Sequence, residues 1–183
     1  SILVHINAKL IWPIPIPAAY GGEKLGAIVI GDSHAAAVVR SVEKALPDTK
    51  LHVLDWSQAA CSTVIGFKAV NGKDAYCAVE KLYEASKQYD PQVPMIIVNR
   101  LAANFHGRNE KAHSEPEWYL KTPYQENPDL FHQELHDAVV ETACKFAQHR
   151  PVYMLRHIPE LKADVPAVMG KTMAIFGEYR RVS

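Results

Sequence analysis

The feature that most constrains the fold of this chain is the alternation of short apolar runs with segments of helical periodicity. Four runs are predicted to be buried strands: about Leu25–Ile30, Leu51–Leu54, Met95–Val98 and Val152–Leu155. Helices are predicted between and after them: about His34–Leu46, Asp74 or Ala75 to Tyr89, from Asn127 onward, and about Val165–Phe176. Such alternation favours a mainly parallel sheet with helices on both faces. The sequence therefore predicts an α/β fold, a three-layer αβα sandwich.

The chain is long enough to form one domain with a full core, because it has 183 residues. Residues 1–24 are predicted to be an irregular leading segment, and residues 25–183 the domain itself. Pro13, Pro15 and Pro17 exclude a helix in the leading segment and favour an extended path at a sheet edge. Residues 101–126 are predicted to be a long polar loop, and loops of that length are usually functional or mobile.

The charge balance argues against nucleic acid as a partner. The chain has 20 Lys and Arg residues and 20 Asp and Glu residues, so its formal net charge is zero. No apolar run approaches the ~20 residues that span a bilayer. The first residues also lack the basic, apolar and small-residue order of a signal peptide. If the domain is exported, we expect a segment outside this chain to direct it.

The tetrapeptide Gly31-Asp32-Ser33-His34 joins the first predicted strand to the first predicted helix. Ser33 therefore lies at or just before the first helical turn, where free N–H groups and the helix dipole favour an anion. A tetrahedral oxyanion is such an anion, so Ser33 is a candidate nucleophile. The alternative is a simple turn in which Asp32 or Ser33 only caps the helix.

Polar residues follow several of the predicted strands: Ser33, Asp55, Asn99, Arg100 and His157. Ligands of parallel α/β sheets bind outside the carboxyl ends of the strands, so we expect these residues to meet at one edge. Asn99 and Arg100 are candidate donors to an oxyanion or to the substrate, or they cap loop carbonyls. Gly66 either offers a backbone N–H or permits a turn. His157 is the alternative candidate for a base within the chain.

The three cysteines do not have the spacing of a structural zinc site, because no Cys-x-x-Cys occurs. Cys61 and Cys77 flank one loop and are able to pair, whereas Cys144 is predicted to be a small core residue of a helix. His132 and His136 are four residues apart, but Glu does not directly follow the first of them as in a zinc-binding helix. We therefore expect no metal and no cofactor.

Aromatic residues are concentrated in the long polar loop. Trp118, Tyr119 and Tyr124 lie there. Their rings either stack on sugars or anchor the loop to the body of the domain.

The motifs, taken in order, resemble the SGNH/GDSL hydrolase superfamily. The closer likeness is to the SGNH-like domain of membrane acyltransferase-3 proteins, which O-acetylate bacterial surface polysaccharides. It extends from about Leu25 to the C-terminus. The first corresponding segments are the Gly-Asp-Ser-His turn at 31–34 and a cysteine-containing loop at 60–66. The second cysteine, Cys77, lies at a predicted helix start. Two strands follow, one that ends in Arg at 93–100 and a late one with a Pro-Glu turn at 151–161. Ser62 and Thr63 replace two prolines of the family, and Leu101 replaces a tryptophan.

This resemblance implies a flavodoxin-like fold of the SGNH hydrolase type and acyl transfer through a Ser ester. Ser33 would be the nucleophile, a His its base, and an Asp would orient that His. The resemblance also implies an extracytoplasmic domain on the periplasmic face of the membrane and a Cys61–Cys77 disulfide. The substrate would be a glycan or an acylated small molecule, and the partner a membrane domain that donates the acyl group.

One element of the family pattern has no counterpart in this chain. The catalytic Asp-x-x-His of the family follows the Pro-Glu turn, but the chain ends at Ser183 before such an element. Asp129–His132 has the spacing but lies upstream in a predicted helix, so no role is transferred to it. The domain is expected to be truncated, and the chain would then hold a nucleophile without its base.

Two functions fit these observations. The first is an esterase or O-acyltransferase that acts on a cell-surface polysaccharide through Ser33. The second is a non-catalytic carbohydrate-binding or docking domain that has an SGNH-like fold without the Asp/His dyad.

Overall fold

The computed structural model describes residues 17–72, 77–110, 113–156 and 165–177. Its main sheet has five strands in the order β1 (Ala18–Gly21), β3 (Leu51–Ser57), β2 (Lys24–Gly31), β5 (Met95–Val98) and β7 (Val152–Met154). β1 pairs antiparallel with β3, and the other pairings are parallel. The predicted mainly parallel sheet is therefore confirmed.

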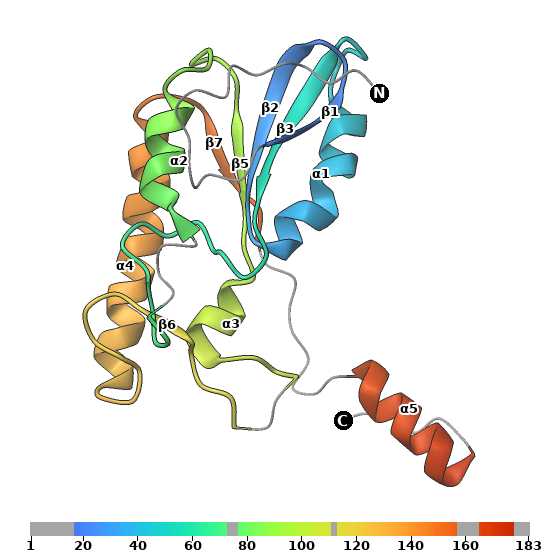
Figure 1. Cartoon of the computed structure of the whole chain (residues 1–183), viewed down its shortest axis with the longest axis vertical. Helices are drawn as coiled ribbons and strands as arrows, with labels where there is room; N and C mark the ends of the chain where they lie inside the picture. Colours follow the sequence, from blue (N-terminus) through green and yellow to red (C-terminus); the bar gives the residue numbers. More distant parts are fainter. Residues whose placement is uncertain (1–16, 73–76, 111–112, 157–164, 178–183) are drawn as a thin grey trace.

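Helices cover both faces of this sheet, as Figure 1 shows. α1 (Ser33–Ala45) packs on one face, where its residues Ala35 and Val39 meet side chains of β2 and β3. α2 (Val79–Ser86) and α4 (Pro128–Ala147) pack on the other face. α3 (Leu101–His106) follows β5, and α5 (Val165–Phe176) projects from the body. The predicted three-layer αβα sandwich is confirmed.

The central strand β2 explains why a continuous apolar run is needed. Ala27 and Val29 point into the α1 layer, whereas Ile28 and Ile30 point into the layer of α2 and α4. All four side chains are almost fully buried. A strand buried on both faces must be apolar at every position, and this run is what made the strand predictable.

Two regions predicted without regular structure contain short elements. β1 lies within the leading segment and is an edge strand, as the run of prolines favoured. α3 and β6 (Trp118–Tyr119) lie within the predicted loop 101–126, and β6 pairs antiparallel with β4 (Lys68–Ala69). A helix of fewer than two turns and a strand of two residues are too short to show a detectable periodicity. The predicted start of the second helix, at Asp74 or Ala75, lies outside the described residues.

Helix α4 confirms its predicted start and corrects one prediction. Asn127 is the N-cap, and its Oδ1 accepts a hydrogen bond from the Leu130 N–H at 3.0 Å. The stripe that includes Phe131 and Thr142 is buried. Cys144, predicted to be a core residue, is exposed. It lies two positions after Thr142 and so points about 200° away around the helix.

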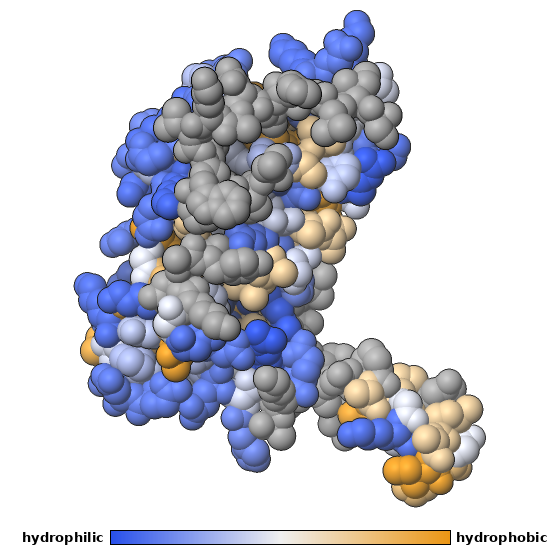
Figure 2. Space-filling view, in the orientation of Figure 1, coloured by the Kyte–Doolittle hydropathy of each residue, from blue (hydrophilic) through white to orange (hydrophobic). Residues whose placement is uncertain are grey.

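The surface differs in character between the body and α5. Figure 2 shows a largely hydrophilic face over the loops around α3, whereas apolar residues gather on α5. Met173, Ile175 and Phe176 of α5 are exposed. Among the described residues, no helix has the length and apolarity that a membrane span requires.

Candidate functional site

The site is built around the turn between β2 and α1. Gly31 ends β2 with a φ of 150°, and a Cβ atom there would lie 1.8 Å from the carbonyl oxygen of Val98 on β5. Only glycine lets the two strands approach this closely at their carboxyl ends. Asp32 then caps the helix, and Ser33, which is exposed, is its first residue. The turn thus places the Ser33 hydroxyl in solvent at the carboxyl edge of the sheet.

Asp32 fixes this turn to a distant part of the chain. Its side chain is buried, with 4% of the residue exposed. Oδ1 accepts from the His34 N–H at 2.8 Å, and Oδ2 accepts from the Arg100 N–H at 2.6 Å. The start of α1 and the end of β5 are therefore held together through one carboxylate.

A second polar contact attaches the loop after β3. The Ser62 hydroxyl lies 2.6 Å from Asn104 Oδ1 and 3.4 Å from Asp32 Oδ2. Because the hydroxyl has one hydrogen, the shorter contact to Asn104 takes it. Ser62 and Asn104 are both buried. The loop after β3, helix α3 and the β2–α1 turn thus converge beside Ser33.

A cavity of about 280 Å³ opens where these elements meet. The β2–α1 turn and the loop after β3 contribute Asp32, Ser33, Ala59, Ala60 and Ser62. Helix α3 contributes Arg100, Ala103 and Asn104. The segment after α3 contributes Arg108, Glu115, Glu117 and Trp118. Ser33 therefore lines a concave site together with a charged and aromatic segment.

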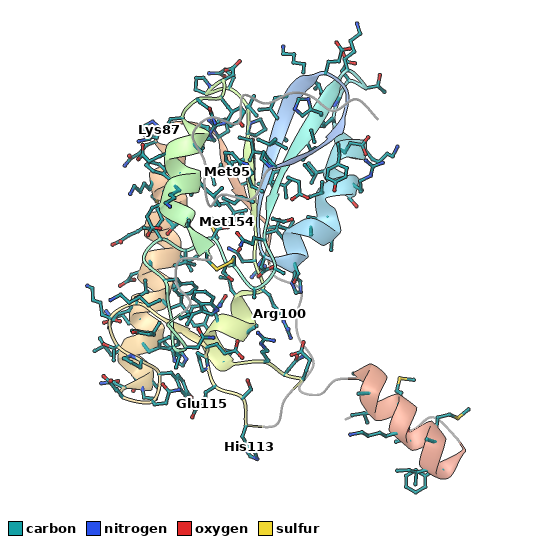
Figure 3. The ribbon with its side chains drawn as sticks, in the orientation of Figure 1. Lys87, Met95, Arg100, His113, Glu115 and Met154 are labelled. Atoms are coloured by element: carbon teal, nitrogen blue, oxygen red, sulfur yellow. A yellow bond between two sulfur atoms is a disulfide. The ribbon has the colours of Figure 1, made fainter. Side chains whose placement is uncertain are left out.

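The arginines of this cavity are paired with carboxylates. Arg108 Nη2 lies 2.8 Å from Glu117 Oε2, and Arg100 Nη1 lies 2.6 Å from Glu110 Oε1. The hydrogen bond from the Arg100 side chain holds the pKa of Glu110 below its ordinary value. Figure 3 shows Arg100 at the start of α3 and Glu115 on the segment below that helix. The cavity therefore combines both signs of charge.

The three predicted donors to an oxyanion or substrate differ in their burial and in their hydrogen-bond partners. Asn99 is buried, its Oδ1 accepts from the Thr63 N–H at 2.9 Å, and its Nδ2 has no partner among the described residues. Arg100 lines the cavity, but its backbone N–H is bound to Asp32. The Gly66 N–H donates to Glu80 Oε1 at 2.8 Å. Of these three residues, only Arg100 lines the cavity.

Two further candidates from the sequence, Asp55 and His132, do not line the cavity. Asp55 lies within β3, where its Oδ1 accepts from the Ser57 N–H at 2.8 Å. His157 lies outside the described residues. His132 Nε2 contacts the Phe105 carbonyl at 2.9 Å. No cluster of three or more potential metal ligands occurs in the described ranges.

The loop aromatics separate into two roles. Tyr119 and Tyr124 pack against the apolar cluster around Val64 and Phe131, which anchors the loop. Trp118 lines the cavity and stacks on Phe67, with ring centroids 5.8 Å apart. Of Trp118, Tyr119 and Tyr124, Trp118 is the one that lines the cavity and is positioned to contact a ligand.

Cys61 and Cys77 form the disulfide that the resemblance implied. The bond, visible in Figure 3, joins the loop after β3 to the start of α2. Because Ser62 directly follows Cys61, the disulfide also fixes a part of the cavity lining. The sequence does not assign Ser62 to the site. The implied Cys61–Cys77 pairing is the feature that could indicate it, because Ser62 is the neighbour of Cys61. Asn104, Arg108 and Glu117 also line the cavity, and no motif in the sequence indicates them.

Comparison with known proteins identifies the family to which the chain is similar. A family profile described as "SGNH domain (fused to AT3 domains)" matches residues 9–180. The periplasmic domain of the lipopolysaccharide acetyltransferase of Salmonella ser. Paratyphi A has a similar structure, with a TM-score of 0.53 at 12% sequence identity. The match covers 87% of this chain and 55% of the Salmonella domain. This chain therefore spans about half the length of that domain. A search of curated protein sequences finds no significant match.

These findings confirm the resemblance seen in the sequence. The structural likeness, at this identity, concerns the fold. The family match covers nearly the whole chain. The chain belongs to the family of SGNH domains that are fused to AT3 domains.

Proposed function

We propose that this chain is the SGNH-type domain of an esterase or O-acyltransferase that moves acyl groups, in particular acetyl, on a cell-surface polysaccharide, with Ser33 as nucleophile. The observation that carries the proposal is the position of Ser33. It is the exposed first residue of α1 and lines a cavity at the carboxyl edge of the sheet. Membership of a family fused to AT3 domains supports acyl transfer as the chemistry.

The proposed reaction has two acyl-transfer steps. A histidine base takes the Ser33 proton while Oγ attacks the carbonyl carbon of an acyl ester. The tetrahedral oxyanion collapses, the C–O bond to the leaving alcohol breaks, and the alcohol takes the proton from the imidazolium. A sugar hydroxyl or water then attacks acyl-Ser33 in the same way and releases the serine. The base is His157 or the His of the family's Asp-x-x-His element.

Two donors are proposed for the oxyanion. The first is the backbone N–H of Ser33, which belongs to the same residue as Oγ and lies at the start of α1. The next two N–H groups already donate to Asp32, that of His34 to Oδ1 at 2.8 Å and that of Ala35 to the carbonyl oxygen at 3.0 Å. The second donor is Asn99 Nδ2, which is buried without a partner among the described residues. The backbone N–H groups of Arg100 and Gly66 are weaker candidates because each already donates to a carboxylate.

The proposed location is extracytoplasmic, on the periplasmic face of a membrane, next to a membrane domain that donates the acyl group. The fusion to AT3 domains in the family name supports this partner. The Cys61–Cys77 disulfide supports an oxidising compartment, since disulfides are rare in the reducing cytosol.

A second candidate function is carbohydrate binding or docking without catalysis. The cavity wall of Trp118 and the Arg108–Glu117 pair favours it, because these groups suit a sugar whether or not a base is present. The two functions differ in whether an ester bond is broken.

Hydrolysis of p-nitrophenyl acetate by the full-length protein separates the two functions. We expect p-nitrophenol to be released faster than in buffer. His157→Ala should lower the rate ~100-fold or more if His157 is the base. His136→Ala is the matched control, because His136 is exposed on α4 and contacts Asp137. Equal rates for His157→Ala and His136→Ala would assign the base to another segment. Sugar binding without any hydrolysis would support the docking function instead.

A further inference from the structure

The cavity beside Ser33 has a wall that the ester chemistry does not need. This wall consists of Arg108, Glu117 and Trp118, which all come from the segment after α3. The rest of the lining, here called the floor, includes small residues and buried polar residues, among them Ala59 and Ser62. An ester carbonyl at Ser33 would use the floor, so the wall is available for the rest of the ligand.

Trp118 is a firmly held ring on this wall. It belongs to β6, where it pairs with Ala69 of β4. Its indole stacks on Phe67 with an interplanar angle of 26°, and the residue is half-buried. The C–H bonds of a sugar carry partial positive charge and pack against the negative face of an aromatic ring. A ring that is already ordered loses little conformational entropy when it binds such a face.

The charges around the cavity argue against an anionic ligand. The lining holds two guanidinium groups, Arg100 and Arg108, and three carboxylates, Asp32, Glu115 and Glu117. Arg108 pairs with Glu117, and Arg100 pairs with Glu110, which is not among the lining residues. A carboxylated sugar would therefore meet no excess of positive charge.

An uncharged sugar matches the same groups. Each sugar hydroxyl is able to donate one hydrogen bond and to accept others. Two neighbouring hydroxyls of one ring are therefore able to donate to a carboxylate and to accept from a guanidinium at the same time. The Arg108–Glu117 pair presents one of each, with its two charged atoms 2.8 Å apart. The volume of about 280 Å³ suits one sugar ring rather than a longer chain segment, since it lies at the lower end of small-molecule sites.

We infer that Trp118, Arg108 and Glu117 form a subsite for one uncharged sugar residue of the glycan that receives or carries the acyl group. The ring lies against Trp118, its hydroxyls bond to the Arg108–Glu117 pair, and another hydroxyl faces Ser33. The assignment of this sugar to the acyl-transfer reaction rests on the proposed function. The binding of the sugar does not.

The test is a titration of the full-length protein carrying Ser33→Ala, in which no ester chemistry at Ser33 interferes. The probes are methyl glucoside, methyl galactoside and methyl rhamnoside, with methyl glucuronide as the charged counterpart, followed by ligand-observed NMR. We expect at least one neutral glycoside to bind more tightly than the glucuronide. Adding Trp118→Ala should raise its Kd about tenfold or more, equivalent to about 1.4 kcal/mol. Adding Trp118→Phe should recover most of the affinity.

Two controls separate a loss of sugar binding from a general effect of the substitution. Tyr153→Ala removes an aromatic ring that is 62% exposed on β7 and should leave the Kd unchanged. If thermal melting shows that Trp118→Ala does not fold, Arg108→Gln replaces it, with the same expected weakening. Tighter binding of the glucuronide, no binding of any neutral glycoside, or folded Trp118→Ala and Arg108→Gln variants that bind the glycoside as tightly as the Ser33→Ala protein does would overturn the inference. Hydrolysis that survives Ser33→Ala would refute the proposed function and leave this titration valid.

Discussion

Replacing Ser33 by alanine is expected to reduce the hydrolysis of p-nitrophenyl acetate by the full-length protein to the rate of buffer, a loss of about 10³-fold or more. The hydroxyl oxygen is the atom proposed to form the acyl ester, and no other described residue on the cavity floor offers a comparable exposed nucleophile. The substitution removes one exposed oxygen and leaves the N-cap, Asp32, in place. Stability should therefore change by no more than about 0.5 kcal/mol.

The matched control for this loss is Ser41→Ala. Ser41 is exposed on the same helix α1 but does not line the cavity. Its variant should hydrolyse p-nitrophenyl acetate at the parent rate. If Ser33→Ala and Ser41→Ala both keep the parent rate, Ser33 is not the nucleophile.

Gly31→Ala is expected to destabilise the domain by about 4 kcal/mol or more. The new methyl group would lie 1.8 Å from the Val98 carbonyl oxygen and 2.8 Å from its carbon. Both atoms belong to the backbone of a paired strand, so no side-chain movement relieves the clash. β2 and β5 would have to separate at the point where Asp32 joins them. Urea unfolding followed by circular dichroism measures the effect.

Gly72→Ala separates the steric clash from backbone strain. Gly72 also has a positive φ, 71°, but a Cβ there meets no atom within 4 Å. This variant should cost only about 1–2 kcal/mol, the expense of placing a non-glycine residue in the left-handed region. If Gly31→Ala costs no more than Gly72→Ala, the close approach of β2 and β5 is not what requires glycine.

The parts of the fold that the sequence predicted are those with long-range periodicity or local capping. Met95–Val98 is β5 with the predicted bounds, because a strand buried on both faces is apolar at every position. α4 starts where Asn127 and a following proline predict, because both signals are local. The placement of Ser33 at a helix start follows in the same way.

The parts of the site that the sequence did not predict depend on contacts between distant segments. The Asp32–Arg100 and Ser62–Asn104 hydrogen bonds join residues 68 and 42 positions apart. Asn104 lies on the short helix α3, whose six residues are too few to show a helical period. The sequence alone does not separate Trp118 from the other loop aromatics, because nothing local distinguishes it from Tyr119.

The most direct test of the central claim is to find which residue carries the acyl group during turnover. The full-length protein is mixed with p-nitrophenyl acetate, quenched in acid within the first turnover, digested and examined by mass spectrometry. We predict one acetyl group on the oxygen of Ser33, absent from the Ser33→Ala protein treated in the same way. Continued hydrolysis with acetyl on another residue, or with Ser33 never acetylated, would contradict the account.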